Sequence, residues 1–412
     1  MLFQTSNNKE SSKNTVKIMN NKLHIIIDLS NILYRSVYAC SYGRDARISD
    51  FGTQYERNVL IRYVTASITR IVNAFMADRV IIVCDTNTRW RNSLYNTATG
   101  DRYKGTRKHD ETKNWDSIYK DIEKLKKIYK ANGFVITSIE GAEADDDAAM
   151  WTEKLLAEGD DVVLVSSDGD WRQLCSYDKD KKNFCICYNP MKNSSSLFGT
   201  EEFMNAMNDN SGEGLDIFFT STRNHHLDNI KNAKTDEKLN YKVIDPNDVV
   251  LEKIMCGDTS DNVHSIFEYY KNGKKIRITP LKAGKIFESL NVKNVQDLVQ
   301  SCNEGKLQPA IEGVMKNTID DGDINEMLMR QRRLVELRSI LFPYEITELF
   351  NKHYYKNTDA GYVSQENLKM SVILNGSVFL EDDYNKPREN GIFDNQNLGK
   401  YFTEDGHLKP QA

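Results

Sequence analysis

Acidic side chains gather at several separate places along this sequence. In the densest group, Glu143 to Asp147, four carboxylates fall within five positions, and the chain then becomes apolar. Like charges at this spacing raise one another's pKa unless solvent or a cation offsets the repulsion. Other acidic residues follow short apolar runs elsewhere in the chain. The candidate ligands for a cation are Asp28, Asp85, Glu143, Asp145, Asp146, Asp168, Asp170, Asp258 and Asp261.

These carboxylates have the chemistry of a Mg²⁺ or Mn²⁺ site. The groups contain no histidine or cysteine, which argues against zinc, and hard cations prefer oxygen ligands. Two such ions about 4 Å apart can clamp a phosphodiester, one helping to generate hydroxide and the other stabilising the departing oxygen. The alternative is structural, because a single Asp often caps a helix and Glu143 to Asp147 could be a solvated helix start. Asp147 is expected to be structural, since its neighbours fill the site-facing positions.

Four of the acidic groups follow or adjoin segments that predict buried strands. These segments are the apolar runs in "KLHIIIDLSN", "RVIIVCDT", "FVITSI" and "DVVLVSSDGD". Between them, residues 57–78, 115–133 and 146–159 carry apolar side chains at helical spacing. Strands that alternate with helices predict a parallel sheet in an α/β domain. Ligand sites form at the carboxyl ends of such strands, so the four acidic groups are expected to converge.

The remaining segments differ from this pattern. Residues 90–115 are basic, aromatic and poorly periodic, and residues 189–240 are polar, as is typical of an insertion. Helices are predicted again before Asp258, from Pro280 and over residues 324–342. The chain after about residue 348 is predicted to be irregular. The first 22 residues are polar and lack the apolar core of a signal peptide, so a disordered leader is expected.

Length and composition limit the class of protein. The chain has 412 residues, enough for two or three domains, and its 39% of hydrophobic residues is typical of a soluble protein. No window approaches the roughly 18 uninterrupted apolar residues that a membrane span needs. The cysteines are scattered, which favours reduced thiols in a cytosolic compartment. The net charge of −5 does not itself indicate nucleic-acid binding, although an acidic pocket and a basic rim can coexist.

Seven short motifs carry a family resemblance. They follow one another in the order "IDLSN", "VIIVCDT", "WR", "YKGTR", "EADDD", "SSDGDW" and "GDTSDNV", between about Leu23 and Phe342. In order and spacing the chain resembles the bacteriophage 5′ nucleases of the flap endonuclease superfamily, and within them the T-even phage ribonuclease H branch. The pair "SSDGDW" and "GDTSDN" is specific, whereas "EADD" alone is less so.

The resemblance implies a fold class and a division of the chain. The expected fold is an α/β, PIN-like parallel-sheet nuclease core with a helical arch, joined to a smaller all-α helix–three-turn–helix module that binds DNA. The implied segments are a leader at 1–22, the core at 23–188 with the arch at about 86–115, an insertion at 189–242, the helical module at 243–347 and an irregular tail at 348–412.

The resemblance also implies roles for the site residues. Around a first metal it places Asp28, Asp85, Asp145 and Asp168, with Glu143 and Asp146 beside it, and around a second metal it places Asp170, Asp258 and Asp261. Lys104 matches the arch lysine that reaches the scissile phosphate, and Arg91 and Arg107 match its cationic companions. Tyr103 is expected to stack on a base. Phosphate contacts of this kind predict steep salt dependence.

Two regions depart from the family. Its members have a glycine-rich turn after "GDxxDN" that often binds K⁺, but here the segment is "HSIFEYYKNGKKIRITPLKAG", which leaves a K⁺ site doubtful. Lys274, Lys275 and Lys282 are expected to bind the duplex instead. In the tail, "NQNLGKYF" places Leu398, Tyr401 and Phe402 at the spacing of a sliding-clamp peptide, the alternative being ordinary tail packing.

The expected activity is a Mg²⁺-dependent, structure-specific 5′ nuclease with exonuclease, flap endonuclease and ribonuclease H activity. Its substrates would be 5′ ends, 5′ flaps and RNA–DNA hybrids, cut by a monomer that leaves 5′-phosphates during phage replication in the host cytoplasm. A sliding clamp and a single-strand-binding protein are the implied partners. One alternative is a phosphatase of the haloacid dehalogenase type, which Leu29 and Ser30 after Asp28 disfavour. The other is a non-catalytic DNA-binding replication factor, which would lack a ligand.

Overall fold

The computed structural model describes residues 21–42, 48–75, 77–86, 89–95, 102–107, 110–131, 133–190, 196–208, 240–319 and 323–357. All but the last two residues of the predicted leader lie outside these ranges, as do Leu398, Tyr401 and Phe402 of the predicted clamp peptide.

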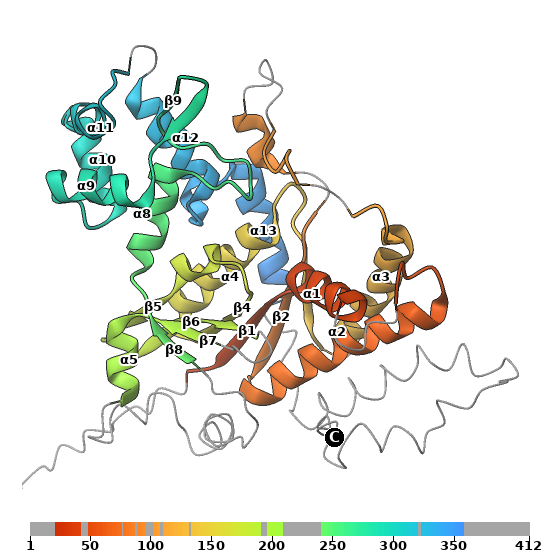
Figure 1. Ribbon diagram of the computed structural model, residues 1–412. Helices are drawn as coiled ribbons and strands as arrows, with labels where there is room; N and C mark the ends of the chain where they lie inside the picture. The colour runs from red at the N-terminus through yellow and green to blue at the C-terminus, as the bar shows by residue number, and fades with distance from the viewer. Residues whose placement is uncertain are drawn as a thin grey trace, which may run out of the picture.

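A mainly parallel sheet forms the centre of the molecule (Figure 1). Its strand order is β3-β2-β1-β4-β6-β7-β8, and β5 (Ser176–Asp178) pairs with β6. The four predicted strands are present and run parallel, which confirms the α/β fold class. They are β1 (Leu23–Asp28), β2 (Arg79–Val83), β3 (Val135–Thr137) and β4 (Asp161–Val165).

Helices cover both faces of this sheet, which explains why its strands are apolar on both faces. Ile25 and Ile27 of β1 pack into one core cluster, and Ile26 between them packs into another, as the two-residue period of a strand requires. The first cluster holds α1 (Leu29–Tyr42), α2 (Gln54–Phe75) and α3 (Trp115–Ala131), and the second holds α4 (Ala144–Glu158) and α13 (Tyr344–Asn357).

The predicted polar insertion at 189–242 is wrong at both of its ends. The sheet continues through β6 (Asn183–Asn189), β7 (Ser196–Gly199) and β8 (Asn240–Val243), with α5 (Glu201–Asn208) after β7. Leu197 and Phe203 are buried in the core, so these short apolar pieces belong to the sheet domain. Residues 209–239 lie outside the described residues.

The predicted irregular tail is wrong for residues 348–357, which are helical in α13. The helix returns to α4 of the core, where Trp151 meets Phe350 and Tyr354 at ring-centroid distances of 5.6 and 4.9 Å. Ile346, Phe350 and Tyr354 are all buried. Their four-residue spacing marks one face of a helix and was the signal in the sequence.

A second unit packs around its own apolar core, apart from the sheet (Figure 1). It contains α8 (Pro246–Cys256), α9 (Pro280–Leu290), α10 (Val295–Asn303), α11 (Leu307–Met315) and α12 (Ile324–Val335). The short 3-10 helix Ser339–Leu341 follows α12 and leads back to the sheet domain.

This unit is not all-α, because a β-hairpin stands where the family has its glycine-rich turn. Strands β9 (Glu268–Lys271) and β10 (Lys274–Arg277) pair antiparallel. The two connecting residues, Asn272 and Gly273, have φ of +52° and +75°. An Asn-Gly pair with both φ angles positive is typical of a two-residue hairpin turn.

Two further expectations concern the cysteines and possible membrane-spanning helices. All seven cysteines are free thiols, and six of them are buried. Within the described residues, no helix is both long and apolar enough to cross a membrane.

Candidate functional site

The carboxyl ends of β1, β2 and β4 bring acidic side chains to one edge of the sheet. Asp28 is the last residue of β1 and lies opposite Val83 of β2, and Ile27 before it lies opposite Val165 of β4. Asp85 follows β2 by two residues, and Asp168 follows β4 by three. Burial and then the charge of Asp85 raise the pKa of Asp28 to about 7, and Asp168 also contributes. These side chains therefore lie within electrostatic reach of one another, as predicted.

Asp28, Asp85, Asp145 and Asp168 are bound by neutral donors. The backbone N–H of Asn31 and the hydroxyl of Ser166 donate to Asp28 at 2.9 and 3.1 Å. The N–H of Ala144 donates to Asp85 at 3.1 Å. No Lys or Arg among the described residues pairs with any of the four, so we call them the cation-free group.

Asp145 is held in the same way, at the start of α4. The indole Nε1–H of Trp171 donates to its Oδ1 at 2.6 Å. Burial raises the pKa of Asp145 well above its usual range; the charge of Lys104 opposes this shift, and Asp168, Glu143 and Asp28 add to it. The backbone N–H of Asp170 donates to Asp168 at 3.0 Å. The cation-free group thus concentrates negative charge with no internal counter-ion in contact.

Asp146 pairs with an arginine of the protein itself, although the resemblance places it beside the first metal. It is fully buried, and Arg91 binds its two oxygens at 2.9 and 2.7 Å. The indole of Trp90 donates to it at 2.9 Å. Asp146 also closes a capping box with Glu143 at the N-terminus of α4. The next residue, Asp147, is likewise buried.

Arg91 is therefore a buried ion-pair residue in this structure and not an exposed DNA contact. It lies on the 3-10 helix Trp90–Leu94 and its residue is only 2% exposed. Besides Asp146 it contacts Glu143 at 3.2 Å, and its Nε donates to the carbonyl of Leu334 at 2.9 Å. All three guanidinium nitrogens thus contact the protein's own atoms.

Glu143 receives three cations. Lys104 Nζ lies 2.5 Å from its Oε1, Arg89 Nε lies 3.2 Å from the same oxygen, and Arg91 approaches the other oxygen. Burial alone would raise the pKa of Glu143, but Lys104 and Arg91 hold it below its usual range. Glu143 is consequently a buried, charged and fully paired carboxylate.

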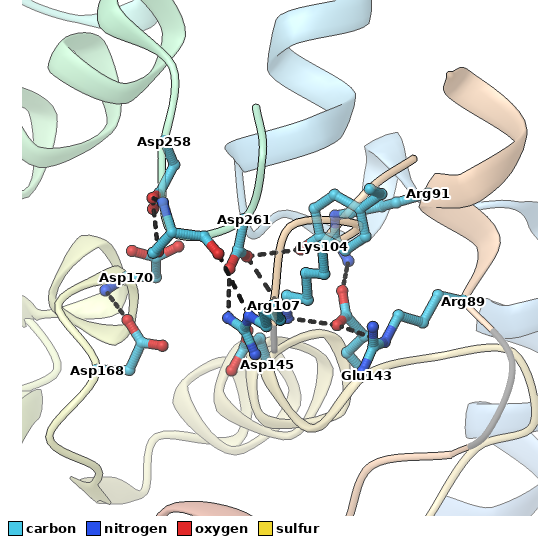
Figure 2. Close-up of polar contacts among 12 residues, drawn as sticks. Arg89, Arg91, Lys104, Arg107, Glu143, Asp145, Asp168, Asp170, Asp258 and Asp261 are labelled. Carbon is cyan, nitrogen blue, oxygen red and sulfur yellow. Dashed lines mark hydrogen bonds and ion pairs between the residues drawn. The ribbon is translucent and has the colours of Figure 1, made fainter. Parts of the chain in front are cut away.

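Asp261 holds the basic turn formed by residues 102–107. Tyr103 donates its hydroxyl to Asp261 at 2.9 Å, and Arg107 forms an ion pair with the same carboxylate. The backbone N–H of Lys104 donates to the carbonyl of Asp261 at 2.7 Å. Figure 2 shows Lys104 and Arg107 between Glu143 on one side and Asp258 with Asp170 on the other.

Tyr103 is not presented for stacking on a base in this arrangement. Only 6% of its surface is exposed, and its ring centroid lies 6.2 Å from that of Tyr95. In the predicted arch at 86–115, the described residues form the 3-10 helix at Trp90, the basic turn and the start of α3 at Trp115. The helical arch itself stays a prediction.

Lys253 is a site residue that sequence reasoning missed. It lies in the last turn of α8, and its ammonium forms ion pairs with both Asp170 and Asp258. Burial opposes the shift, but Lys253 and Ser260 lower the pKa of Asp258 to about 2. Burial raises the pKa of Asp170 to about 6, although Lys253 acts in the opposite direction. The available signal was a lysine one helical turn before the "GDTSDN" motif.

The site therefore contains a second set of carboxylates that is matched by internal cations. We call it the cation-paired group; its members are Glu143, Asp146, Asp170, Asp258 and Asp261. Among the described residues, no three His, Cys, Asp or Glu side chains converge closely enough to hold one metal ion. The donors are nevertheless carboxylate oxygens, which suit Mg²⁺ or Mn²⁺. The ammonium of Lys253 shows that a cation is accommodated between Asp170 and Asp258.

The predicted duplex-binding lysines lie on the second unit, around the hairpin. Lys274 and Lys275 are exposed on β10, and Lys275 pairs with Glu268 at 2.8 Å. Lys282 on α9 donates to the carbonyl of Arg277 at 3.1 Å.

Comparison with known proteins finds a family model that matches the sheet domain. Residues 23–208 match the model described as 5′-3′ exonuclease, N-terminal resolvase-like domain. This part of the chain is similar to that family, in agreement with the resemblance of the motifs that lie within it.

Two relatives share part of this sequence. The chain is 29% identical over 101 residues to ribonuclease H of Enterobacteria phage T4, and 30% identical over 152 residues to a 5′-3′ exonuclease of Buchnera aphidicola. The matches cover 24% and 36% of this chain, and 32% and 47% of the relatives. The chain therefore spans less than half of the length of either relative.

Solved structures of bacteriophage T5 nucleases also resemble the chain. The T5 D15 protein co-crystallised with metal ions matches with a TM-score of 0.48 and 18% identity, over 82% of this chain and 99% of that protein. A complex of the T5 D15 flap endonuclease with DNA and metal ions matches with a TM-score of 0.47 and 18% identity, over 82% of this chain and all of that protein.

Proposed function

We propose that this protein is a divalent-metal-dependent, structure-specific 5′ nuclease. It would hydrolyse phosphodiesters at 5′ ends and 5′ flaps of DNA and in RNA–DNA hybrids, and leave 5′-phosphates. The observation that carries the proposal is that Asp28, Asp85, Asp145 and Asp168 lie within electrostatic reach of one another at one sheet edge, and that no Lys or Arg pairs with them among the described residues.

The donor set supports the choice of metal. Asp28, Asp85, Asp145 and Asp168 would have to draw closer together to hold one ion, since no three acidic side chains of the described residues meet closely enough as they stand. Asp170 and Asp258, with Asp261 once released by the basic turn, would hold another. Mg²⁺, or Mn²⁺ in its place, would lower the pKa of a bound water and stabilise charge on the departing oxygen. Burial first, and neighbouring carboxylates second, raise the pKa values of Asp28 and Asp145, and a divalent ion beside them would favour their charged forms.

The chain's own residues would supply orientation and positive charge. Trp171 and the N–H groups of Asn31 and Ala144 fix the directions of the carboxylates. Lys104 and Arg107, on the basic turn above the carboxylates, are the cations that could leave their acidic partners for a phosphate. Arg91 would support the site from beneath by holding Asp146 and Glu143.

The second unit is proposed to grip the duplex. The exposed Lys274 and Lys275 and the partly buried Lys282 would contact phosphates, and such contacts release counter-ions and make affinity depend on salt. K⁺ binding next to the hairpin has no support in the residues there. A clamp peptide at Leu398, Tyr401 and Phe402 remains a proposal, tested by deleting residues 395–412 and measuring clamp-stimulated cleavage.

The decisive experiment uses a duplex with a 5′ flap, labelled at the 5′ end, and Mg²⁺. Wild type is expected to cut, and the product ladder will separate exonuclease from flap endonuclease activity. Asp168→Asn and Asp170→Asn should lose at least about a hundredfold in rate, because carboxylate ligands contribute several kcal/mol through the metal. Binding of the duplex in Ca²⁺ should persist in both. A parallel flap with an RNA 5′ segment tests the hybrid substrate.

Three outcomes would contradict the proposal. Cleavage by both Asn variants at the wild-type rate would remove the metal assignment. Binding without cleavage by wild type would favour the non-catalytic replication factor. Hydrolysis of p-nitrophenyl phosphate with no cleavage of the flap would favour the phosphatase.

A further inference from the structure

Lys253 occupies a place in the site that the proposed chemistry leaves unexplained. It lies on α8 of the second unit, yet its ammonium reaches Asp170 on the 3-10 helix Asp170–Leu174 of the sheet domain. It also pairs with Asp258, which follows its own helix by two residues. One lysine thus joins the two carboxylates that would hold an ion at this half of the site.

The surroundings of Lys253 fix it in this position. Its side chain is only 20% exposed. Its carbonyl accepts the N–H of Gly257 at 2.9 Å, which ties the end of α8 to the loop that carries Asp258. Oδ1 of Asp258 accepts two hydrogen bonds from Ser260, at 2.7 Å from the N–H and 2.6 Å from the hydroxyl. Oδ2 of Asp258 is the oxygen that pairs with the ammonium of Lys253.

The charges here differ from those in the cation-free group. Asp28, Asp85, Asp145 and Asp168 have no cation in contact, so an ion entering among them meets repulsion only from more distant cations such as Lys104. An ion approaching Asp170 and Asp258 meets carboxylates that are already neutralised, and an ammonium that repels it. Asp170 and Asp258 cannot both pair with the ammonium of Lys253 and bind a divalent ion through the same oxygens.

We propose that Lys253 is a built-in competitor of the divalent ion at Asp170 and Asp258. It stabilises the metal-free site and is displaced when the ion binds, so that this half of the site takes its ion more weakly than the cation-free half. The inference rests on the proposed function only in assuming that a divalent ion binds here. Lys253 is accordingly a positioning residue that sets ion affinity.

The test is calorimetric titration of the full chain with Ca²⁺ and with Mn²⁺, without nucleic acid. Lys253→Met is expected to bind the weaker of two ions about tenfold more tightly than wild type, a coupling of ordinary size between two interacting ligands. Lys253→Arg keeps the charge and should stay close to wild type. Lys274→Met, which removes an exposed lysine of the hairpin, is the matched control and should not change the titration.

Thermal unfolding supplies a second readout that does not depend on activity. In EDTA, Lys253→Met should melt below wild type, because Asp170 and Asp258 lose their counter-ion. Saturating Ca²⁺ should then raise the melting temperature of the variant more than that of wild type. If Lys253→Met proves too unstable to titrate, Lys253→Gln, which keeps a hydrogen-bond donor, replaces it.

The outcomes separate the two proposals. If wild type binds ions but Lys253→Met binds them equally or more weakly, Lys253 is not a competitor and only this inference falls. If neither protein binds a divalent ion, the proposed function falls with it. Adding Asp170→Asn to Lys253→Met should abolish the gain in affinity; a gain that survives would place the effect elsewhere and overturn the inference.

Discussion

The two groups of carboxylates at this site are both crowded and largely buried, but they differ in the partners that hold them. In the cation-free group, Asp28 and Asp145 are oriented by N–H and hydroxyl donors, and their pKa values are raised. In the cation-paired group, Glu143 and Asp258 face arginine or lysine, and their pKa values are lowered. The first arrangement leaves negative charge for an external cation, whereas the second satisfies it from within.

The difference teaches which acidic residues can be available to a ligand. A carboxylate that is buried with a bidentate arginine, as Asp146 is with Arg91, gains little by exchanging that partner for an ion. A carboxylate held by neutral donors has no internal cation that an ion must displace. Four predictions test this contrast, beginning with the largest expected effect.

Arg91→Met should lower the free energy of unfolding by about 3–5 kcal/mol, because it leaves Glu143 and Asp146 buried with fewer partners. Urea denaturation measures the change. The control is Arg338→Met, which removes a half-exposed guanidinium 3.8 Å from Glu336 and should change stability by no more than about 0.5 kcal/mol. Equal losses of stability in both variants would show that the buried ion pairs of Arg91 contribute no more than an exposed ion pair.

Asp28→Asn should remove a pH dependence of stability in EDTA. Burial and the charge of Asp85 raise the pKa of Asp28 to about 7 in the folded state, so the folded state favours the protonated form. Protonation of Asp28 therefore stabilises the folded state. This contribution to the free energy of unfolding is fully present below about pH 4 and is lost as the pH rises towards 7, by at most about 4 kcal/mol.

Unfolding by urea at a series of pH values measures this slope. Asp178→Asn, at an exposed aspartate on β5, should keep the wild-type slope between about pH 4 and 7. Backbone N–H donors lower the pKa of Asp178, so it stays ionised over this range. A slope that persists unchanged in Asp28→Asn would mean that Asp28 already has a counter-ion.

Gly257→Ala should destabilise the loop that carries Asp258. Gly257 has φ of +71°, and an added Cβ would lie 2.3 Å from the carbonyl oxygens of Val263 and His264. Such a backbone position costs a side chain about 1–3 kcal/mol, and the clash adds to it. Gly313→Ala is the control, because nothing lies within 4 Å of that Cβ and alanine favours the helix. A neutral Gly257→Ala in urea denaturation would show that this loop relaxes freely.

Tyr103→Phe has the smallest expected effect, a loss of about 1 kcal/mol for one buried hydrogen bond to Asp261. Urea denaturation measures it against Tyr344→Phe, at an exposed tyrosine, which should be neutral. A much larger loss would mean that the basic turn depends on this hydroxyl more than on the ion pair of Arg107.

The sequence was sufficient for the sheet and for the meeting of the acidic groups. The runs ending at Asp28 and near Asp85 and Asp168 are β-branched, short and followed by polar residues, and parallel strands must end at a common edge. Strand identity and order of elements are local properties of such runs.

The sequence could not predict which donor or cation each carboxylate contacts, because these contacts join residues that are distant in the chain. Nothing local distinguishes Asp145 from Asp146, yet one accepts an indole N–H and the other receives Arg91 from residues earlier in the chain. Lys253 was missed for the same reason. The hairpin at Asn272-Gly273 and the helix around Phe350, in contrast, had readable turn and spacing signals.

One backbone feature separates two contributions of Lys104. Its φ of +56° lies in the left-handed region, where an ordinary side chain is disfavoured, and its N–H is bound to Asp261. Alanine is disfavoured in this conformation about as much as lysine, so Lys104→Ala would report mainly the lost ammonium. Asparagine favours the left-handed conformation, so Lys104→Asn would remove the charge and relieve the backbone together.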